Sequence, residues 1–186
     1  MITELTGLAK EAHQINRNNG FWDEVPPLKQ CIALAIGELF EALEADRVGK
    51  TMAKINSSEE RRMLMNDLNA HFDPMFFKIA VKDTVEDELA DVVIRCMDTL
   101  VGHQIESEDI TAIHAPTEFE NISEFIMSTI SIIMWQYNKN NISECLQSLI
   151  SCCYSYASSK GMHLDWHIRM KMAYNATRER KHGKAY

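Results

Sequence analysis

Two acidic patterns set within apolar helical segments place the strongest constraint on how this chain can fold. Glu38 and Glu41 form the first pattern, and Glu88 and Asp91 form the second. Residues three apart on an α-helix lie on the same side, so each segment presents two neighbouring carboxylates. Apolar residues flank both pairs, which predicts that both lie near the core: Ile36, Leu39, Phe40 and Leu43 for the first, and Val85, Leu89, Val92 and Val93 for the second.

Carboxylates held together away from water repel one another, and this costs free energy unless a cation compensates them. A divalent metal ion is the most direct compensation. Oxygen ligands without an accompanying His or Cys favour a hard cation, Mg²⁺ first and Mn²⁺ second. Acidic residues three apart also occur on solvated helix faces. Two such pairs, both flanked by apolar residues, favour the metal site.

The length, net charge and apolar content of the chain limit the number of its domains and the kinds of partner it can have. We expect one domain over residues 1–186, with an insertion at 50–83 and additional helices in 104–160. The net charge of -8 argues against sequence-independent nucleic-acid binding, because phosphate contacts need a basic surface. There is no long apolar run and no leader-like N-terminus, so we expect a cytoplasmic protein without membrane contact.

Helical periodicity and helix-start signals recur along the whole chain. Thr84 with Asp87, and Asn141 with Glu144, have the spacing of capping boxes. No segment alternates convincingly with the period of a β-strand. The expected fold class is therefore all-α, an antiparallel helix bundle. We expect helices over residues 2–18, 28–48, 58–71, 84–103, 117–137 and 141–159, and from 165 into the basic tail.

The basic C-terminal segment offers groups that suit a polyphosphate. Lys171, Asn175 and Arg178 follow one another at spacings of four and three, so one helical face presents an ammonium, an amide and a guanidinium. Phosphoryl transfer needs divalent cations on the phosphate oxygens and cationic side chains on the remaining charge. A cationic last turn is also common for its interaction with the helix dipole, so this segment alone is weak evidence.

Three segments, in this order, resemble the MazG-like nucleotide pyrophosphohydrolases of the all-α NTP pyrophosphatase superfamily. They are GELFEALEADR at 37–47, EDELADVVIR at 86–95 and KMAYNATRERKHGK at 171–184. The first two contain the ExxE and ExxD patterns that mark the superfamily. The resemblance covers residues 10–103 and 162–186, and nothing in 104–160 is recognised.

The resemblance implies Mg²⁺-dependent hydrolysis of a ribo- or deoxyribonucleoside triphosphate to the monophosphate and pyrophosphate, in nucleotide-pool housekeeping. Mn²⁺ could replace Mg²⁺, and the protein would assemble as a homodimer or homotetramer. A metal ion would also lower the pKa of the attacking water. The likeness assigns the metal ligands as Glu38, Glu41, Glu88 and Asp91, and the phosphate ligands as Lys171, Asn175 and Arg178.

Two departures from the family pattern concern the general base and the spacing. Gly37 stands where relatives often have an acidic residue, so the base could be Glu41, Glu44 or a metal-bound hydroxide, with Glu41 our first candidate. More residues than usual separate the two acidic pairs, which an inserted helix at 58–71 would accommodate.

Phe21 and Trp22 follow a glycine turn and precede the first acidic pair. Aromatic faces of this kind stack on nucleobases. They also pack against the ends of helix bundles, which is about as common. We therefore keep both a base-binding role and a packing role for these two residues.

Other functions compete with this prediction. A di-iron carboxylate bundle needs Glu-x-x-His on two helices, and the chain has that spacing only at Glu179 and His182. A non-enzymatic helical scaffold would use the apolar helix at 117–137 as a partner surface and leave the acidic pairs solvated. Within the enzymes, a dUTP-selective diphosphatase competes with broad nucleotide hydrolysis.

Overall fold

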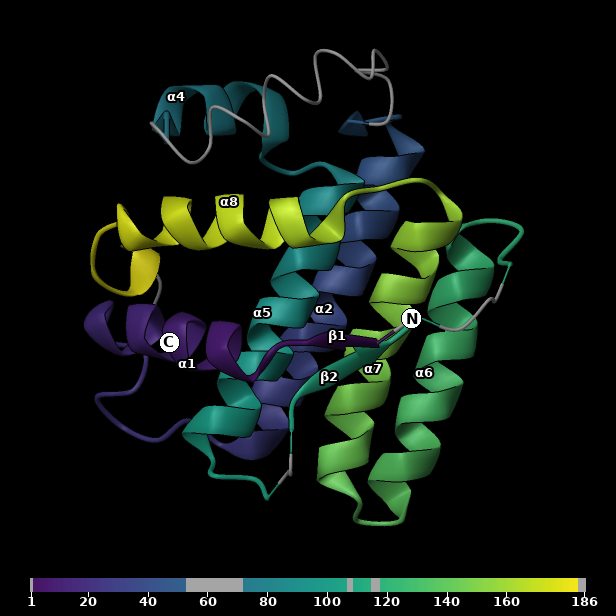
Figure 1. Cartoon of the computed structure of the whole chain (residues 1–186), viewed down its shortest axis with the longest axis horizontal. Helices are drawn as coiled ribbons and strands as arrows, with labels where there is room; N and C mark the ends of the chain where they lie inside the picture. The colour runs from purple at the N-terminus through teal and green to yellow at the C-terminus, as the bar shows by residue number, and fades with distance from the viewer. Residues whose placement is uncertain (1, 53–71, 107–108, 115–117, 184–186) are drawn as a thin grey trace.

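The computed structural model describes residues 2–52, 72–106, 109–114 and 118–183. Within these ranges the chain is mostly helical, as the all-α prediction requires, and it adds one short two-stranded sheet (Figure 1). The helix expected at 58–71 lies outside the described residues. The elements are β1 (Ile2–Glu4), α1 (Thr6–Asn18), α2 (Leu28–Arg47), α4 (Pro74–Phe76), η2 (Phe77–Val81), α5 (Val85–Gly102), β2 (Thr111–Ile113), α6 (Ile122–Asn138), α7 (Ile142–Ser159), α8 (Leu164–Ala176) and η3 (Arg180–Gly183).

Helix α5 is the central element of the fold. It packs most extensively against α2, and it also contacts α1, α7 and α8 (Figure 1). Apolar side chains on all these helices form one continuous core, in which Leu39, Leu89, Leu100, Phe125 and Ile150 are almost completely buried. Because α5 is surrounded on several sides, even the acidic residues of its first turns are buried.

A second, smaller apolar cluster holds α8 in its position across α5. Phe77 and Val81 of η2 pack against Trp166, Met170 and Tyr174 of α8. The rings of Phe77 and Tyr174 are stacked, with their centroids 4.5 Å apart. Apolar burial of this kind supplies most of the free energy that fixes one helix against its neighbours. It therefore sets the position of the residues that α8 directs toward α5.

The predicted starts of α5 and α7 are confirmed by their caps. The Thr84 side chain accepts a hydrogen bond from the backbone N–H of Asp87, at 3.2 Å. Asn141 accepts one from Glu144 in the same way, at 3.3 Å. Each cap satisfies a backbone donor that the first helical turn leaves without an intrahelical partner.

Three expected boundaries were wrong. Helix α8 ends at Ala176 and does not continue into the basic tail, so Arg178 lies beyond the helical face that carries Lys171 and Asn175. Residues 2–4, predicted to be helical, form β1, which pairs antiparallel with β2 inside the predicted loop 107–116. Each strand has three residues, which is too short for an alternating pattern to be recognisable. Helix α6 begins at Ile122, later than predicted, because the Asn121 side chain caps it by accepting the N–H of Glu124 at 3.0 Å.

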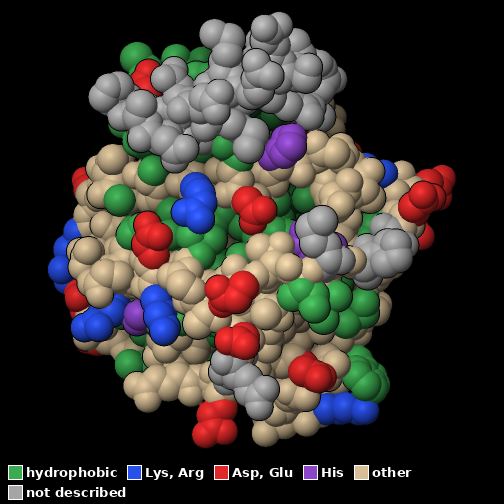
Figure 2. All heavy atoms as spheres, in the orientation of Figure 1, with side chains coloured by type: hydrophobic (Ala, Val, Ile, Leu, Met, Phe, Trp, Pro, Cys, Tyr) green, Lys and Arg blue, Asp and Glu red, His purple; other side chains and the backbone are tan. Residues whose placement is uncertain are grey.

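The surface and the helix lengths bear on possible partners. On the face shown in Figure 2, acidic and basic side chains are interspersed, and those described there form no continuous basic surface. None of the helices in the described ranges combines the length and the apolar character that crossing a bilayer requires.

Candidate metal and phosphate site

Three carboxylates converge where α2 packs against α5. Glu38 comes from α2, and Glu88 and Asp91 come from α5; each offers an oxygen atom, and these atoms lie within 4.8 Å of one another. Glu38 and Glu88 are only 5% and 4% exposed and Asp91 is half-buried, so the cluster is largely buried. The convergence of the two predicted acidic segments is thus a property of the fold.

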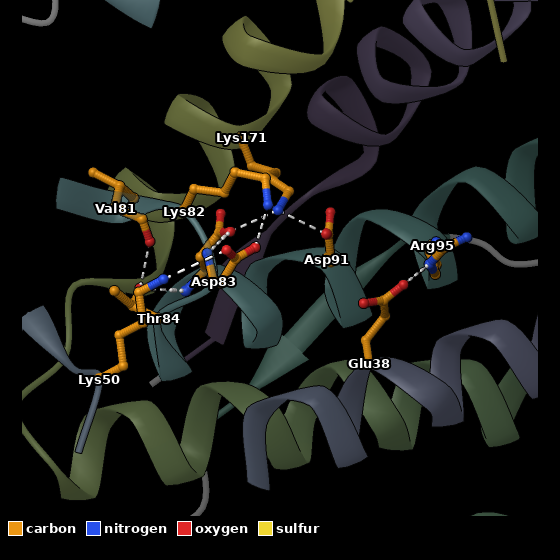
Figure 3. Close-up of polar contacts among 10 residues, drawn as sticks. Glu38, Lys50, Val81, Lys82, Asp83, Thr84, Asp91, Arg95 and Lys171 are labelled. Atoms are coloured by element: carbon orange, nitrogen blue, oxygen red, sulfur yellow. Dashed lines mark hydrogen bonds and ion pairs between the residues drawn. The ribbon is translucent and has the colours of Figure 1, made fainter. Parts of the chain in front are cut away.

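Arg95 neutralises part of this cluster. Its Nε donates a hydrogen bond to Oε1 of Glu38 at 2.6 Å (Figure 3). Burial raises the pKa of Glu38 and the charge of Asp91 raises it further, whereas Arg95 lowers it. Arg95 was not predicted, although it lies four residues after Asp91 and seven after Glu88, which places all three on one face of α5.

Lys171 of α8 is the second cation of the cluster. Its Nζ lies 2.8 Å from Oδ2 of Asp91, as Figure 3 shows. It also lies 2.7 Å from Oδ2 of Asp87. Burial disfavours the charged ammonium, but Asp91 and Asp87 outweigh this and raise the pKa of Lys171 above its ordinary value. The lysine is therefore protonated and held between two carboxylates.

Asp87 is a site residue that the sequence analysis missed. Its side chain is fully buried, and its Oδ2 accepts the backbone N–H of Asp83 at 3.0 Å in addition to Lys171. Its other oxygen, Oδ1, is buried without a hydrogen-bond partner in the described part of the chain. Burial raises the pKa of Asp87 to about 6, although Lys171 opposes the shift. One signal in the sequence could have identified Asp87: it precedes Asp91 by four residues, so the two side chains lie on the same side of α5.

Glu88 has the most strongly perturbed carboxyl of the cluster. Burial raises its pKa to about 9; Lys171 opposes this, and the neighbouring carboxylates add to it. Within the described ranges its side chain takes part in no ion pair. A buried carboxyl in this position stays ionised only if additional positive charge arrives.

The count of charges within the described cluster shows how much positive charge is lacking. Two cations, Arg95 and Lys171, face four carboxylates, those of Glu38, Asp87, Glu88 and Asp91. With all four carboxylates ionised, the cluster has an excess of two negative charges, which one divalent ion would balance. The donors are all oxygens, which suits Mg²⁺ or Mn²⁺, so the residues fit the predicted metal. Asp83 also approaches Asp87 and Glu88, but Lys50 and Lys82 already pair with it.

The predicted metal and phosphate residues all line one cavity of about 660 Å³. Lys171 and Asn175 are buried, and Oδ1 of Asn175 has no hydrogen-bond partner in the described part of the chain. Glu41, predicted to be near the core, is exposed instead and is absent from the group of converging oxygens. The cavity is lined by Asn16, Phe21, Leu34, Glu38, Glu41, Lys82, Asp83, Glu88, Asp91, Ile94, Arg95, Lys171, Asn175 and Arg178.

A second cavity, of about 300 Å³, adjoins the first and shares Asn16, Phe21, Leu34 and Arg95 with it. Trp22 lines only this second cavity, together with apolar residues such as Val25. The two aromatic residues predicted to bind a base therefore have different places. Phe21 contacts both cavities, and Trp22 contacts the second.

Asp98, which the sequence analysis also missed, fixes the wall of the second cavity. Its carboxylate accepts hydrogen bonds from Nε1 of Trp22 at 2.9 Å and from Nδ2 of Asn16 at 2.7 Å, and it pairs with Nδ1 of His13 at 2.7 Å. Asp98 lies seven residues after Asp91, so it continues the same face of α5. One face of the central helix thus serves both cavities.

Gly102→Ala should displace the Trp22 ring and lower stability by about 1–3 kcal/mol, the usual cost of overpacking. A Cβ at position 102 would lie 2.1 Å from the Trp22 ring, which Asp98 holds in place. Urea unfolding and tryptophan fluorescence would measure the effect. Gly37→Ala is the matched control, because a Cβ there meets nothing within 4 Å. Equal stability of the two variants would contradict this packing.

The chain matches no family model, no curated protein and no solved structure in the three comparisons made with known proteins.

Proposed function

We propose that this chain is a Mg²⁺-dependent, MazG-like nucleoside triphosphate pyrophosphohydrolase, which converts a ribo- or deoxyribonucleoside triphosphate to the monophosphate and pyrophosphate. One observation carries the proposal: the oxygens of Glu38, Glu88 and Asp91 converge within 4.8 Å in a largely buried cluster, in which four carboxylates face two cations. A solvated acidic surface would neither bury these groups nor bring two helices together around them.

In this proposal Glu38, Glu88 and Asp91 hold the metal ion. A divalent ion bound there would lower the pKa of the attacking water and neutralise charge on the phosphates. Glu41 lines the same cavity from an exposed position on α2, which leaves it free to accept a proton from that water. Arg95 keeps the Glu38 carboxylate oriented through its hydrogen bond.

The phosphates would lie along the α8 side of the cavity. Lys171 and Asn175 lie one turn apart on α8, Arg178 lies two residues beyond the end of this helix, and all three line the same cavity as the carboxylates. Cationic groups in a largely buried site stabilise the charge that develops on phosphate oxygens more strongly than they would in water.

The second cavity would receive the nucleoside. Its volume of about 300 Å³ and its partly apolar lining suit a base with its sugar. The indole N–H of Trp22 is occupied by Asp98, so Trp22 would form a rigid wall. Phe21, which contacts both cavities, has the better position to stack on the base. A dUTP-selective enzyme would use the same metal site and differ only in this second cavity.

Pyrophosphate release from a panel of ribo- and deoxyribonucleoside triphosphates, dUTP included, tests the proposal. With Mg²⁺, at least one nucleotide should yield its monophosphate and pyrophosphate. EDTA should abolish the reaction, and Mg²⁺ or Mn²⁺ should restore it. In isotopically labelled water the label should enter the monophosphate, because water attacks the α-phosphorus. Release of orthophosphate with a diphosphate product, or no turnover of any nucleotide, would overturn the proposal.

A further inference from the structure

Lys171 pairs with two carboxylates of the acidic cluster. Its Nζ lies within 2.8 Å of carboxylate oxygens from both Asp87 and Asp91. Its side chain is only 7% exposed, so water screens these contacts little. Two short ion pairs at a buried site make the ammonium an integral part of the cluster.

Asp91 belongs both to an ion pair and to the proposed metal site. It pairs with Lys171, and it is one of the three residues whose oxygens converge with those of Glu38 and Glu88. A divalent ion in that group would lie close to the lysine ammonium. Two cations so close together repel each other strongly in a site of low dielectric constant. The metal and Lys171 therefore oppose each other at Asp91.

Asp87 differs from Asp91 in this respect. It is absent from the Glu38–Glu88–Asp91 group, it is fully buried, and its Oδ2 is fixed by the backbone N–H of Asp83. Its ion pair with Lys171 can therefore persist when the lysine leaves Asp91. Lys171 therefore has one ion pair, with Asp87, that metal binding leaves intact, and a second, with Asp91, that metal binding can replace.

We propose that Lys171 is an internal counter-ion that competes with the divalent cation for Asp91, while Asp87 keeps the lysine beside the cluster. This inference rests on the proposed function, because it concerns the same metal. In the metal-free protein Lys171 stabilises the cluster. When the metal takes Asp91, the ammonium turns toward the cavity that it lines and becomes available to a phosphate.

Titration with Mn²⁺ alone, in the absence of nucleotide, tests this competition. Free Mn²⁺ is followed by electron paramagnetic resonance with the full-length chain. Removing the competing charge in Lys171→Met should tighten Mn²⁺ binding by about tenfold or more. Lys171→Arg keeps the charge and should show no such gain. A lysine with a purely structural role would give no tightening on removal.

A second variant guards against loss of folding in Lys171→Met. The double variant Asp87→Asn with Lys171→Met keeps the net charge of the parent and removes the fully buried carboxylate with which Lys171 pairs. It should also bind Mn²⁺ about tenfold more tightly than the parent, because Asp91 is released. Lys82→Met is the matched control: Lys82 lines the same cavity but pairs with Asp83, so binding should stay within about twofold.

The result that overturns the inference is a folded double variant that binds Mn²⁺ no more tightly than the parent. If the parent still hydrolyses nucleotides with Mg²⁺ in that case, the proposed function stands and only the competition is wrong. If the parent neither binds Mn²⁺ nor hydrolyses any nucleotide, and the double variant binds no better, both proposals fail.

Discussion

Glu88→Gln should lower Mg²⁺-dependent nucleotide hydrolysis by about a thousandfold, because it removes one of three converging ligands from the proposed metal site. The same change should keep or raise the free energy of unfolding in the absence of metal, by up to about 1–4 kcal/mol, because Gln is already neutral, whereas folding buries Glu88 and raises its pKa to about 9, so that near neutral pH the carboxyl must take up a proton. Loss of activity with retained stability distinguishes a metal ligand from a packing residue. Steady-state kinetics and urea unfolding measure the two effects.

Glu44→Gln is the control for this prediction. Glu44 lies on α2, it is exposed and pairs with Arg47 on the surface, and it is not among the residues that line the first cavity. Its loss should change both activity and stability little, because exposed ion pairs contribute about 0–1 kcal/mol. If Glu88→Gln hydrolysed nucleotides at the rate of the parent, the metal site would have to be elsewhere.

The helices that carry the site could be predicted because their signals are local. Thr84 caps α5 and Asn141 caps α7, each as the sequence indicated. These signals depend on hydrogen bonds and dihedral angles within a few residues of each helix end. The β1–β2 pairing had no such signal, because it joins three residues at the N-terminus to three residues near position 112. Only the tertiary fold brings these segments together.

The site itself was predictable in part. The sequence identified both acidic pairs, but their convergence depends on how α2 packs against α5. Glu41 is exposed although Glu38 is buried, because a step of three residues turns about 60° around the helix axis and passes the edge of the buried face. Asp87 was assigned only to the start of α5, and its long-range contact with Lys171 could not be read from that local pattern.

One charged face of α5 contributes residues both to the proposed metal site and to the second cavity, which is proposed to receive the nucleoside. Glu88, Asp91, Arg95 and Asp98 follow at spacings of three, four and three, so they form one stripe along the helix. The first two face the acidic cluster, Arg95 lines both cavities, and Asp98 holds the wall of the second. Because these charged residues recur at helical spacing among apolar neighbours, the stripe could have been recognised in the sequence as a candidate site.

Lys171→Met should lower the free energy of unfolding by about 3–5 kcal/mol when no metal is present, the usual cost of removing one partner from a buried ion pair. The ammonium pairs with Asp87, which is fully buried, and with Asp91, so its loss leaves the cluster without one of its two cations. Added Mg²⁺ should restore part of this loss, because binding to the folded state alone stabilises it. Urea unfolding with EDTA and with Mg²⁺ measures both effects.

Lys82→Met provides the comparison for this loss of stability. Lys82 pairs with Asp83, whose side chain is 54% exposed, so its removal should cost less than about 1 kcal/mol, and Mg²⁺ should change the result little. The contrast tests burial directly, because both variants remove one lysine from the same cavity. If the two variants were equally stable, Lys171 would not be paired with Asp87 and Asp91 in a buried cluster. If Mg²⁺ did not raise the free energy of unfolding of Lys171→Met, the cluster would not be the place where the metal binds.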